Sequence, residues 1–353
     1  MHNNKRPTIA RIAEQAKLSV ATVDRVLNAR APVNPHTSQK VYEAAEALGY
    51  YAARLMSQRI AKHKPGFRLS FLLMAHDSPF YTQLQQGIEA AARACIEANV
   101  LCHFARQRER SPEAIAGQIG ELAAQCDCLA VVSYEHPLIS QAMANARAAG
   151  VVVVSVLSEN ATPGLSPYIG SDNTACGRTA GWLLSHLIGP RAARVATLLG
   201  GHRFVGHEAR DRALREYLHR HAPHLQVLAP IINLDNPAMA EEATFELLAR
   251  HEGLGGVYIT GGGSEGLVRA LRQLPARPAI HVITHELTAV HAQALADGLL
   301  SVVFDTDTQA LGQALVKRMM GLATPGHQDD GRAWHVPFRL VTPENLQQVT
   351  CWR

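Results

Sequence analysis

The stretch TIARIAEQAKLSVATVDRVLN, residues 8–28, contains two short amphipathic segments separated by a polar break. Thr8 can cap a first helix and Ser19 a second, because each hydroxyl precedes a run with helical periodicity. At about 100° per residue, the second segment has an apolar and a polar side, formed by Val23, Val26 and Leu27 and by Ala21, Asp24, Arg25 and Asn28. This pattern predicts a helix-turn-helix whose second helix can enter a major groove. An ordinary helical hairpin is the alternative.

A third helix is predicted to close a small core with the first two. Asn34 is a good cap, Pro35 suits the first helical position, and Gly49 suits the end. Between them the apolar residues repeat at helical spacing, namely Val41, Ala44, Ala45 and Leu48. Residues 1–50 are therefore expected to form an all-α headpiece.

The literal sequence of this headpiece resembles the DNA-reading headpiece of the lac repressor (LacI) family. The similarity lies in Ile12-Ala13, Ala16, Ser19 and the run from Thr22 to Asn28. It implies that Val20, Ala21 and Arg25 contact bases, and that Ser19 and Thr22 hold phosphates. With the segment that follows, the residues expected at the DNA are Thr8, Ser19, Val20, Ala21, Thr22, Arg25, Asn28, Leu55 and Arg59.

Asp24 departs from the family pattern, which usually has Ser at this position. A carboxylate so close to the DNA should repel phosphate, unless it accepts from a cytosine amino group or pairs with Arg25. Replacing Asp24 with Ser should then tighten nonspecific binding.

Residues 51–66 form a basic segment that is compatible with a helix until Pro65-Gly66. The resemblance implies a hinge helix that folds on the operator and inserts a leucine into the minor groove. Here Ala52 stands where the family has Pro, and the leucine position falls on or beside Arg59 and Ile60. Leu55 or Ile60 can serve as the wedge; a flexible basic linker that contacts only phosphates is the alternative.

From Phe67 onward, short apolar runs alternate with helical stretches, which favours parallel sheets covered by helices. So many strands exceed one usual sheet, so two similar α/β halves are expected. The predicted strands are 68–75, 100–105, 128–134, 151–157, 195–201, 227–234, 256–262, 281–286 and 300–305.

The order of motifs in residues 67–353 resembles ribose-binding proteins and the sugar-binding cores of lac-repressor-type regulators. The resemblance rests on the segments 78–81, 168–173, 206–210, 261–264, 285–288 and 304–307, with Gly312 beyond the last crossing between halves. It implies a two-lobed, periplasmic-binding-protein-like core with two Rossmann-like subdomains. Ligands of parallel sheets bind beyond the carboxyl ends of the strands, here in the cleft between the halves.

A sugar needs an apolar surface for its C–H groups and paired polar groups for its hydroxyls. Phe80 and Tyr81 can supply the surface, although core packing is an equal alternative. Arg210 can bind adjacent hydroxyls or a carboxylate, or else form a surface ion pair; Asp172 can accept hydroxyl protons or cap a helix. The ligand residues expected from the resemblance are Ser78, Phe80, Tyr81, Ser158, Asp172, Arg210, Gly263, Ser264, Glu286 and Asp305. Leu157 and Glu286 depart from the family pattern, so the pocket should not be that of a plain ribose binder.

Charge and composition agree with a DNA-binding protein. Residues 1–66 carry a net charge of +7 and the remainder −3, which suits a protein that holds a polyanion at one end. No apolar run has transmembrane length and the N-terminus lacks a secretion signal, so a cytoplasmic protein is expected. The histidines and cysteines show no paired ligand spacing, so neither a zinc site nor another cofactor is expected.

These features together predict a ligand-responsive transcriptional regulator, a repressor in the first instance, that binds a pseudo-palindromic operator as a homodimer or homotetramer. Its effector is expected to be a carbohydrate. An α/β enzyme fused to a DNA-binding headpiece is the alternative, but the Gly261–Gly263 run lacks the P-loop and dinucleotide-binding patterns. A transporter's solute-binding protein is disfavoured by the headpiece and the missing signal peptide.

Overall fold

The computed structural model describes residues 8–28, 33–50, 64–74, 79–109, 111–160, 162, 164–201, 204–327 and 331–350. Residues 51–63 of the predicted hinge, which spans 51–66, lie outside the described residues, and its last residue, Gly66, begins the first strand of the sheets.

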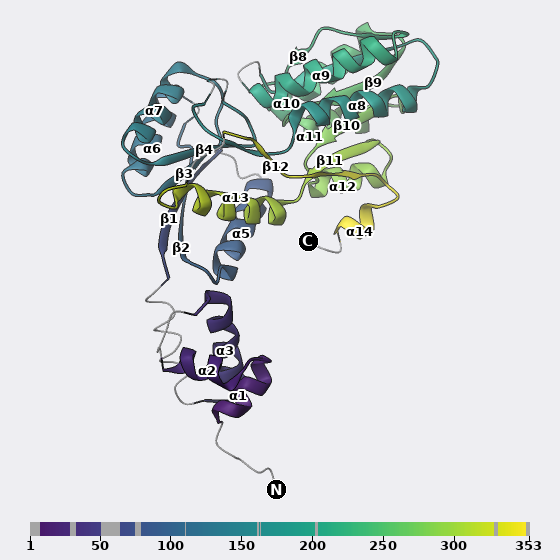
Figure 1. Cartoon of the computed structure of the whole chain (residues 1–353). Coiled ribbons are helices and arrows are strands. Elements are labelled where there is room, and N and C mark those ends of the chain that lie inside the picture. Colours follow the sequence, from purple (N-terminus) through teal and green to yellow (C-terminus); the bar gives the residue numbers. More distant parts are fainter. Residues whose placement is uncertain are drawn as a thin grey trace. The chain divides into compact units, whose positions relative to one another are not determined.

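The headpiece consists of three helices, α1 (Ile9–Ala16), α2 (Val20–Leu27) and α3 (Pro35–Ala47), as predicted (Figure 1). The Oγ1 of Thr8 accepts from the backbone N–H of Arg11 at 3.4 Å, and the Oγ of Ser19 accepts from that of Thr22 at 3.1 Å. Each hydroxyl satisfies a backbone donor that a helix leaves free at its start. The three helices enclose a small apolar core of Ile12, Ala13, Val23, Val41, Ala44 and Ala45.

The turn between α1 and α2 depends on Lys17, whose φ of 55° places it in the left-handed region. Its backbone N–H donates back to the carbonyl of Glu14, and that of Leu18 donates to Ala13. The chain therefore reverses within three residues, and Leu18 packs against the core. This compact reversal is the turn of the predicted helix-turn-helix.

The first sheet has six strands in the order β12-β5-β4-β3-β1-β2. Helices α6 and α7 pack on one of its faces, where Ile115, Ile139 and Met143 meet Leu129 and Val153. Helix α13 contacts β3, β4 and β5. This first lobe contains β1 (Gly66–Leu73), α5 (Pro79–Ala94), β2 (Asn99–Arg106), α6 (Pro112–Ala123), β3 (Cys128–Val131), α7 (Pro137–Ala148), β4 (Val152–Val156), β5 (Tyr168–Gly170), α13 (Thr308–Ala323) and β12 (Trp334–His335).

The second sheet follows the order β13-β11-β10-β9-β6-β7, with β8 also paired to β6. Its pairings are parallel except that of β11 with β13. This second lobe contains α8 (Asn173–Ile188), β6 (Ala193–Leu199), α9 (Val205–His221), β7 (Leu225–Val227), β8 (Ile231–Ile232), α10 (Pro237–Arg250), β9 (Leu254–Ile259), α11 (Ser264–Gln273), β10 (His281–His285), α12 (Ala289–Ala296), β11 (Val302–Thr306), β13 (Phe338–Val341) and a short α14 (Leu346–Thr350).

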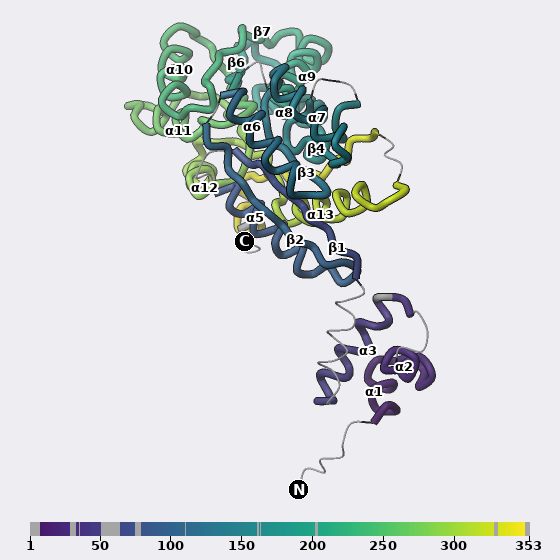
Figure 2. The backbone as a smooth tube through the Cα atoms, turned by 90° about the vertical axis from the view of Figure 1, so that its left-hand side faces the viewer, coloured from purple at the N-terminus to yellow at the C-terminus, as the bar shows by residue number. Residues whose placement is uncertain are grey.

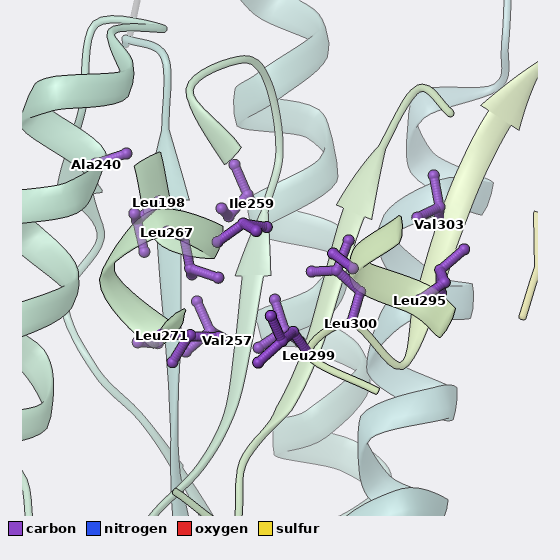
Figure 3. Close-up of a cluster of buried hydrophobic side chains, with 14 of the residues drawn as sticks. Leu198, Ala240, Val257, Ile259, Leu267, Leu271, Leu295, Leu299, Leu300 and Val303 are labelled. Atoms are coloured by element: carbon purple, nitrogen blue, oxygen red, sulfur yellow. The ribbon is translucent and has the colours of Figure 1, made fainter. Parts of the chain in front are cut away.

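Both faces of the second sheet are apolar, because helices cover each of them. On one face, Leu267 and Leu271 of α11 and Leu295 of α12 pack against strand residues such as Val257 and Val303 (Figure 3). On the other face, α8 and α9 pack against the same strands through a separate buried cluster. Because helices cover both faces of the sheet, its strands need apolar side chains on both faces and therefore appear in the sequence as near-continuous apolar runs.

The chain crosses between the lobes three times (Figures 1 and 2). The first crossing leads from β5 into α8 and the second from β11 into α13, as the motif order predicts. A third crossing leads from β12 to β13, so the prediction that residues 304–307 form the last crossing is wrong. The short runs at 334–341 carry too weak a strand signal in the sequence for that return to be foreseen.

The predicted strand 227–234 is also wrong as a single element. The structure has two short strands, β7 and β8, on either side of Pro230. Proline has no backbone N–H and therefore interrupts a ladder of hydrogen bonds. Both pieces still pair with β6, so the sheet keeps its order.

Candidate functional site

The second helix of the headpiece exposes the face that the sequence assigns to DNA. Ala21, Arg25 and Asn28 are exposed, and Val20 keeps 54% of its accessible surface despite being apolar. Val23, on the opposite side of the helix, is fully buried. The helix therefore presents small apolar groups and a guanidinium on one side, which suits contact with thymine methyls and guanine.

Ser19 and Thr22 form one unit at the start of α2. Their side-chain oxygens lie 2.7 Å apart, and Ser19 also accepts from the Thr22 backbone N–H. The free backbone donors and positive dipole end of a helix attract phosphate. Thr8 occupies the matching position at the start of α1. The geometry is compatible with the expected phosphate contacts.

Asp24 interacts with Asn28 on the same helix. The Asn28 Nδ2 donates to the Asp24 Oδ1 at 2.7 Å, one helical turn away. This bond orients Asn28, which the sequence assigns to DNA, and gives the carboxylate a neutral donor. Leu55 and Arg59, the other two predicted DNA residues, lie outside the described residues.

A cavity of about 650 Å³ opens at the carboxyl ends of the strands, between the two lobes. The first lobe contributes Met74, Pro79, Phe80, Tyr81 and Leu157, and the second contributes the charged groups. Six of the predicted ligand residues line it, namely Phe80, Tyr81, Arg210, Gly263, Ser264 and Glu286. The rings of Phe80 and Tyr81 meet edge to face, with centroids 5.2 Å apart.

Arg210 is the buried cation of the cavity. Its Nε donates to the Asn173 Oδ1 at 2.8 Å, and its Nη1 donates to the Thr260 carbonyl at 2.7 Å. Its Nη2 makes no hydrogen bond with any of the described residues, although only 9% of the residue's surface is exposed. The guanidinium is therefore held in place with a donor remaining for a bound molecule.

Glu286 faces Arg210's cavity from the end of β10, with a left-handed φ of 61°. The Thr306 Oγ1 donates to its Oε1 at 2.9 Å, and the Thr306 N–H to its Oε2 at 3.3 Å. Burial raises the pKa of Glu286 to about 7, and the charge of Asp305 raises it as well. Near neutral pH this carboxyl can therefore either donate or accept a hydrogen bond.

The structure places three predicted ligand residues away from the cavity lining. Asp305 is buried and accepts from the Leu287 N–H at 3.1 Å and from Arg339 at 2.7 Å. Asp172 caps α8 by accepting from the Ala175 N–H at 2.9 Å, the alternative role considered for it. Ser158 is buried beside the cavity residue Leu157, and its Oγ has no hydrogen-bond partner among the described residues.

Ser78 lies outside the described residues. Its position in the chain is between Met74 and Pro79, which both line the cavity. Its role as a ligand contact stays a prediction.

Several cavity residues were missed by sequence reasoning: His207, Asp235, Asn236, His285, Thr288 and His291. Asp235 accepts from the Gly262 N–H at 2.7 Å and so joins the loops that follow β8 and β9, the strands on either side of β6. It directly follows the predicted strand 227–234, so the rule that ligands bind beyond strand ends would have found it. His207 and His285 lie in the segments 206–210 and 285–288, in which the sequence analysis assigns only Arg210 and Glu286 to the ligand.

The cavity histidines are uncharged at neutral pH. Burial lowers the pKa of His207 to about 4, with Asp235 acting in the opposite direction and Arg210 in the same one. Burial also lowers the pKa of His285 well below its ordinary value. The Nε2 of His285 lies 2.7 Å from the Tyr258 hydroxyl. The charge in the cavity is thus carried by Arg210 and the carboxylates, and the imidazoles serve as neutral donors or acceptors.

Ser264 and His291 form a buried pair at the start of α11. The Ser264 Oγ lies 2.8 Å from the His291 Nε2, and the His291 Nδ1 lies 2.5 Å from the Glu286 carbonyl. Because a carbonyl only accepts, Nδ1 carries the proton and Nε2 accepts from Ser264. Gly263, with φ of 89°, brings the backbone close to the Asn233 side chain before this helix begins.

Metal sites and membrane-spanning helices were also sought among the described residues. Within it, no group of three His, Cys, Asp or Glu side chains is placed to hold a metal ion. None of the helices described has the length and apolar character needed to cross a lipid bilayer.

Two family models match the chain. "Bacterial regulatory proteins, lacI family" matches residues 8–52, and "Periplasmic binding protein domain" matches residues 69–328. These models describe a regulator and a binding domain rather than an enzyme.

The chain is similar in sequence to curated transcriptional regulators. The ribose operon repressor of Halalkalibacterium halodurans is 31% identical over 103 residues, which is 29% of this chain and 30% of that protein's length. The HTH-type transcriptional regulator GalS of Salmonella typhimurium is 26% identical over 263 residues, 71% of each chain. The first match therefore spans less than a third of the relative, and the second spans most of it.

The fold has solved counterparts. GanP, a glucose-galactose binding protein from Geobacillus stearothermophilus, superposes with a TM-score of 0.72 at 17% identity. The similarity covers 80% of this chain and 99% of that one. At this identity the likeness establishes the two-lobed α/β architecture.

Proposed function

Because the chain belongs to the periplasmic binding protein domain family and carries a lacI-family regulatory domain at its N-terminus, we propose that it is a sequence-specific transcriptional regulator. In this proposal α2 reads an operator in the major groove, and a small carbohydrate in the cleft between the lobes controls operator affinity. Repression is the proposed outcome.

The observation that carries the proposal is the presence of both sites in one chain. The exposed side of α2 carries Arg25 and Ala21 next to a fully buried Val23, so the face is available without disturbing the core. The cavity is lined by Arg210 and Glu286 of the second lobe together with Phe80 and Tyr81 of the first. A regulator needs such a pair of sites, because an effector acts by changing affinity elsewhere.

A carbohydrate is the effector class that the cavity favours. Sugars present hydroxyls that both donate and accept, together with C–H surfaces that pack on aromatic rings. Arg210 offers donors, Asp235 and Glu286 offer acceptors, and neutral imidazoles offer either. The names of the ribose operon repressor and of GanP agree with this class. The cavity volume of about 650 Å³ lies within the usual range for small-molecule sites.

The remaining parts of the proposal concern assembly and domain division. Residues 1–50 would be the headpiece, 51–66 the hinge, with Leu55 and Arg59 at the DNA, and 67–353 the effector and oligomerisation domain. A single headpiece offers too few contacts for a specific affinity of ~10⁻⁸ M or better. We therefore propose a homodimer or homotetramer on a pseudo-palindromic operator, acting in the cytoplasm.

The test combines DNA binding with effector binding. Operator sequences are selected from a random duplex pool with the full chain, and affinity is then measured with and without each sugar. A thermal-shift panel of D-ribose, D-arabinose, D-glucose, D-galactose and D-fucose, extended to polyols and sugar phosphates, finds the effector, because a ligand of the folded state stabilises it. Duplex binding that survives removal of residues 1–66 would refute the proposal, as would an effector that leaves operator affinity unchanged.

A further inference from the structure

Arg339 binds side chains at the end of β11, where the chain passes from the second lobe into α13. It lies on β13, directly opposite Asp305 of β11. Its Nη2 and Nε reach the Asp305 Oδ2 at 2.7 and 3.3 Å, and its Nη1 reaches the Asp307 Oδ2 at 3.1 Å. The guanidinium therefore binds the two carboxylates on either side of Thr306.

Thr306 is the residue that holds Glu286. Its hydroxyl and its backbone N–H donate to the two carboxylate oxygens of Glu286. Glu286 lines the cavity, whereas Arg339 is not among the lining residues. Arg339 thus stands one step behind a cavity group, connected to it through Thr306.

Each of the two carboxylates has a second structural task. Asp305 is 1% exposed and accepts from the N–H of Leu287, the residue after Glu286. A carboxylate buried this deeply needs a partner charge. Asp307 caps α13 through the N–H groups of Gln309 and Ala310, both at 3.0 Å. Arg339 therefore connects the cavity wall with the helix that packs on the first sheet.

We propose that Arg339 is a positioning residue of the effector site, which acts through Asp305, Asp307 and Thr306 to set the orientation and protonation of the Glu286 carboxyl group. The inference rests on the proposed function in so far as the cavity binds an effector. The effect of Arg339 on the protonation of Glu286 does not depend on whether an effector binds.

The charges around Glu286 give the direction of the effect. Asp305 on β11 and Arg210 on α9 act on its carboxyl group. Glu286 itself raises the pKa of the Cys176 thiol on α8, and His291 on α12 bonds to the Glu286 backbone carbonyl. After burial, Asp305 is the largest cause that raises the pKa of Glu286. Because Arg339 offsets the charge of Asp305, its loss should raise the pKa of Glu286 further. Lysine keeps the positive charge and should largely preserve the pKa.

The experiment measures the protonation of Glu286 without any ligand. The infrared carboxylic-acid band that Glu286→Gln removes is followed against pH in the full chain, in Arg339→Gln and in Arg339→Lys. We expect its midpoint to rise by at least about half a pH unit in Arg339→Gln and to stay near the original in Arg339→Lys. Arg269→Gln is the matched control, since its ion pair with Glu241 lies in the same lobe and outside the cavity lining. An unchanged midpoint in Arg339→Gln overturns the inference.

A double variant guards against misfolding of Arg339→Gln. Asp305→Asn with Arg339→Gln leaves no unpaired buried charge, so the fold should tolerate it better. It also removes the Asp305 charge that Arg339 offsets, so the rise expected of Arg339→Gln should be absent. A midpoint above that of the original chain contradicts the inference.

Sugar binding provides the second readout. Each sugar of the panel that binds the original chain is titrated by calorimetry into the variants. We expect affinity to fall at least about fivefold in Arg339→Gln and to stay within about twofold in Arg339→Lys and Arg269→Gln. Equal affinity in Arg339→Gln removes the effector-site part of the inference. If no sugar binds the original chain, the carbohydrate proposal fails, and the infrared midpoint still decides the role of Arg339.

Discussion

The Nε of Arg210 donates a hydrogen bond of 2.8 Å to the Oδ1 of Asn173, and this bond links α9 to α8 inside the second lobe. The Asn173 Nδ2 in turn donates to the Tyr168 hydroxyl at 3.2 Å, which belongs to the strand that precedes the first crossing. Arg210 is therefore oriented by the scaffold before a ligand arrives. Such preorganisation reduces the entropy that binding must overcome.

Arg210→Ala should abolish the thermal stabilisation given by the sugar that the panel identifies. The variant loses the cavity's fixed guanidinium and the donors that a hydroxyl pair would use. Arg212→Ala is the control, because Arg212 lies on the same helix and is exposed. Differential scanning fluorimetry with and without the sugar measures both. A normal response of Arg210→Ala would mean that the sugar binds elsewhere.

Arg25→Ala should reduce discrimination between the selected operator and unrelated duplex by about 1–3 kcal/mol, since a bidentate contact to guanine is lost. Lys40→Ala, on the exposed surface of α3, should leave that ratio unchanged. Fluorescence anisotropy on the two duplexes gives the ratio. The expectation fails if Arg25→Ala weakens both duplexes equally.

Asp24→Ser should tighten binding to unrelated duplex. The substitution removes a negative charge from the DNA side of α2 and frees the Asn28 amide, which donates to Asp24 at 2.7 Å. A salt titration of nonspecific affinity measures the effect, with Glu43→Ser on α3 as the charge-matched control. Affinity that is unchanged or weaker across the titration would count against a repulsive role.

Sequence reasoning succeeded where a single local signal sufficed. The caps at Thr8, Ser19 and Asn34 and the buried strands were all visible as residue types at fixed spacing. The sequence is compatible with Asp172 either as a helix cap or as a ligand contact, and the structure shows it as the cap of α8. Asp305 is not among the residues that line the cavity, and its partner Arg339, 34 residues away in the sequence, follows a crossing with no strong sequence signal of its own.

The pH dependence of stability should reveal Glu286. Its folded pKa of about 7 lies above the ordinary 4.5, so the folded state binds the proton more tightly. This contribution is complete below pH 4.5 and is lost as the pH rises towards 7, on the order of 3 kcal/mol in total. His207 has a lowered pKa and acts in the opposite direction between about pH 4 and 6.5. The contribution of Glu286 is therefore isolated by comparing the original chain with a variant that lacks this carboxyl group.

The comparison is the difference in unfolding free energy between the original chain and Glu286→Gln, measured by urea denaturation from pH 4.5 to 7.5. The original chain should lose stability relative to Glu286→Gln as the pH rises. A constant difference would show that Glu286 titrates normally.

Gly312→Ala should destabilise the fold by about 1–3 kcal/mol or more. A Cβ at Gly312 would lie 2.5 Å from the Gly87 carbonyl carbon, so α13 and α5 must separate. Gly117→Ala on α6 is the control, because a Cβ there meets nothing within 4 Å and removes glycine's entropic cost of about 0.5–1 kcal/mol. Urea denaturation should move the two variants in opposite directions. Equal shifts would show that the helices can accommodate the extra carbon.

The three crossings have a consequence for biosynthesis. The first lobe starts at residue 66, yet its sheet and helical cover are completed by α13 and β12, which are synthesised roughly 140 and 160 residues after β5. The second lobe is threaded between these parts and is nearly finished earlier. During translation the headpiece can fold at once, whereas a growing chain shorter than about 335 residues exposes an unfinished apolar sheet. Nascent chains stalled before and after α13 should therefore differ sharply in their demand for chaperones.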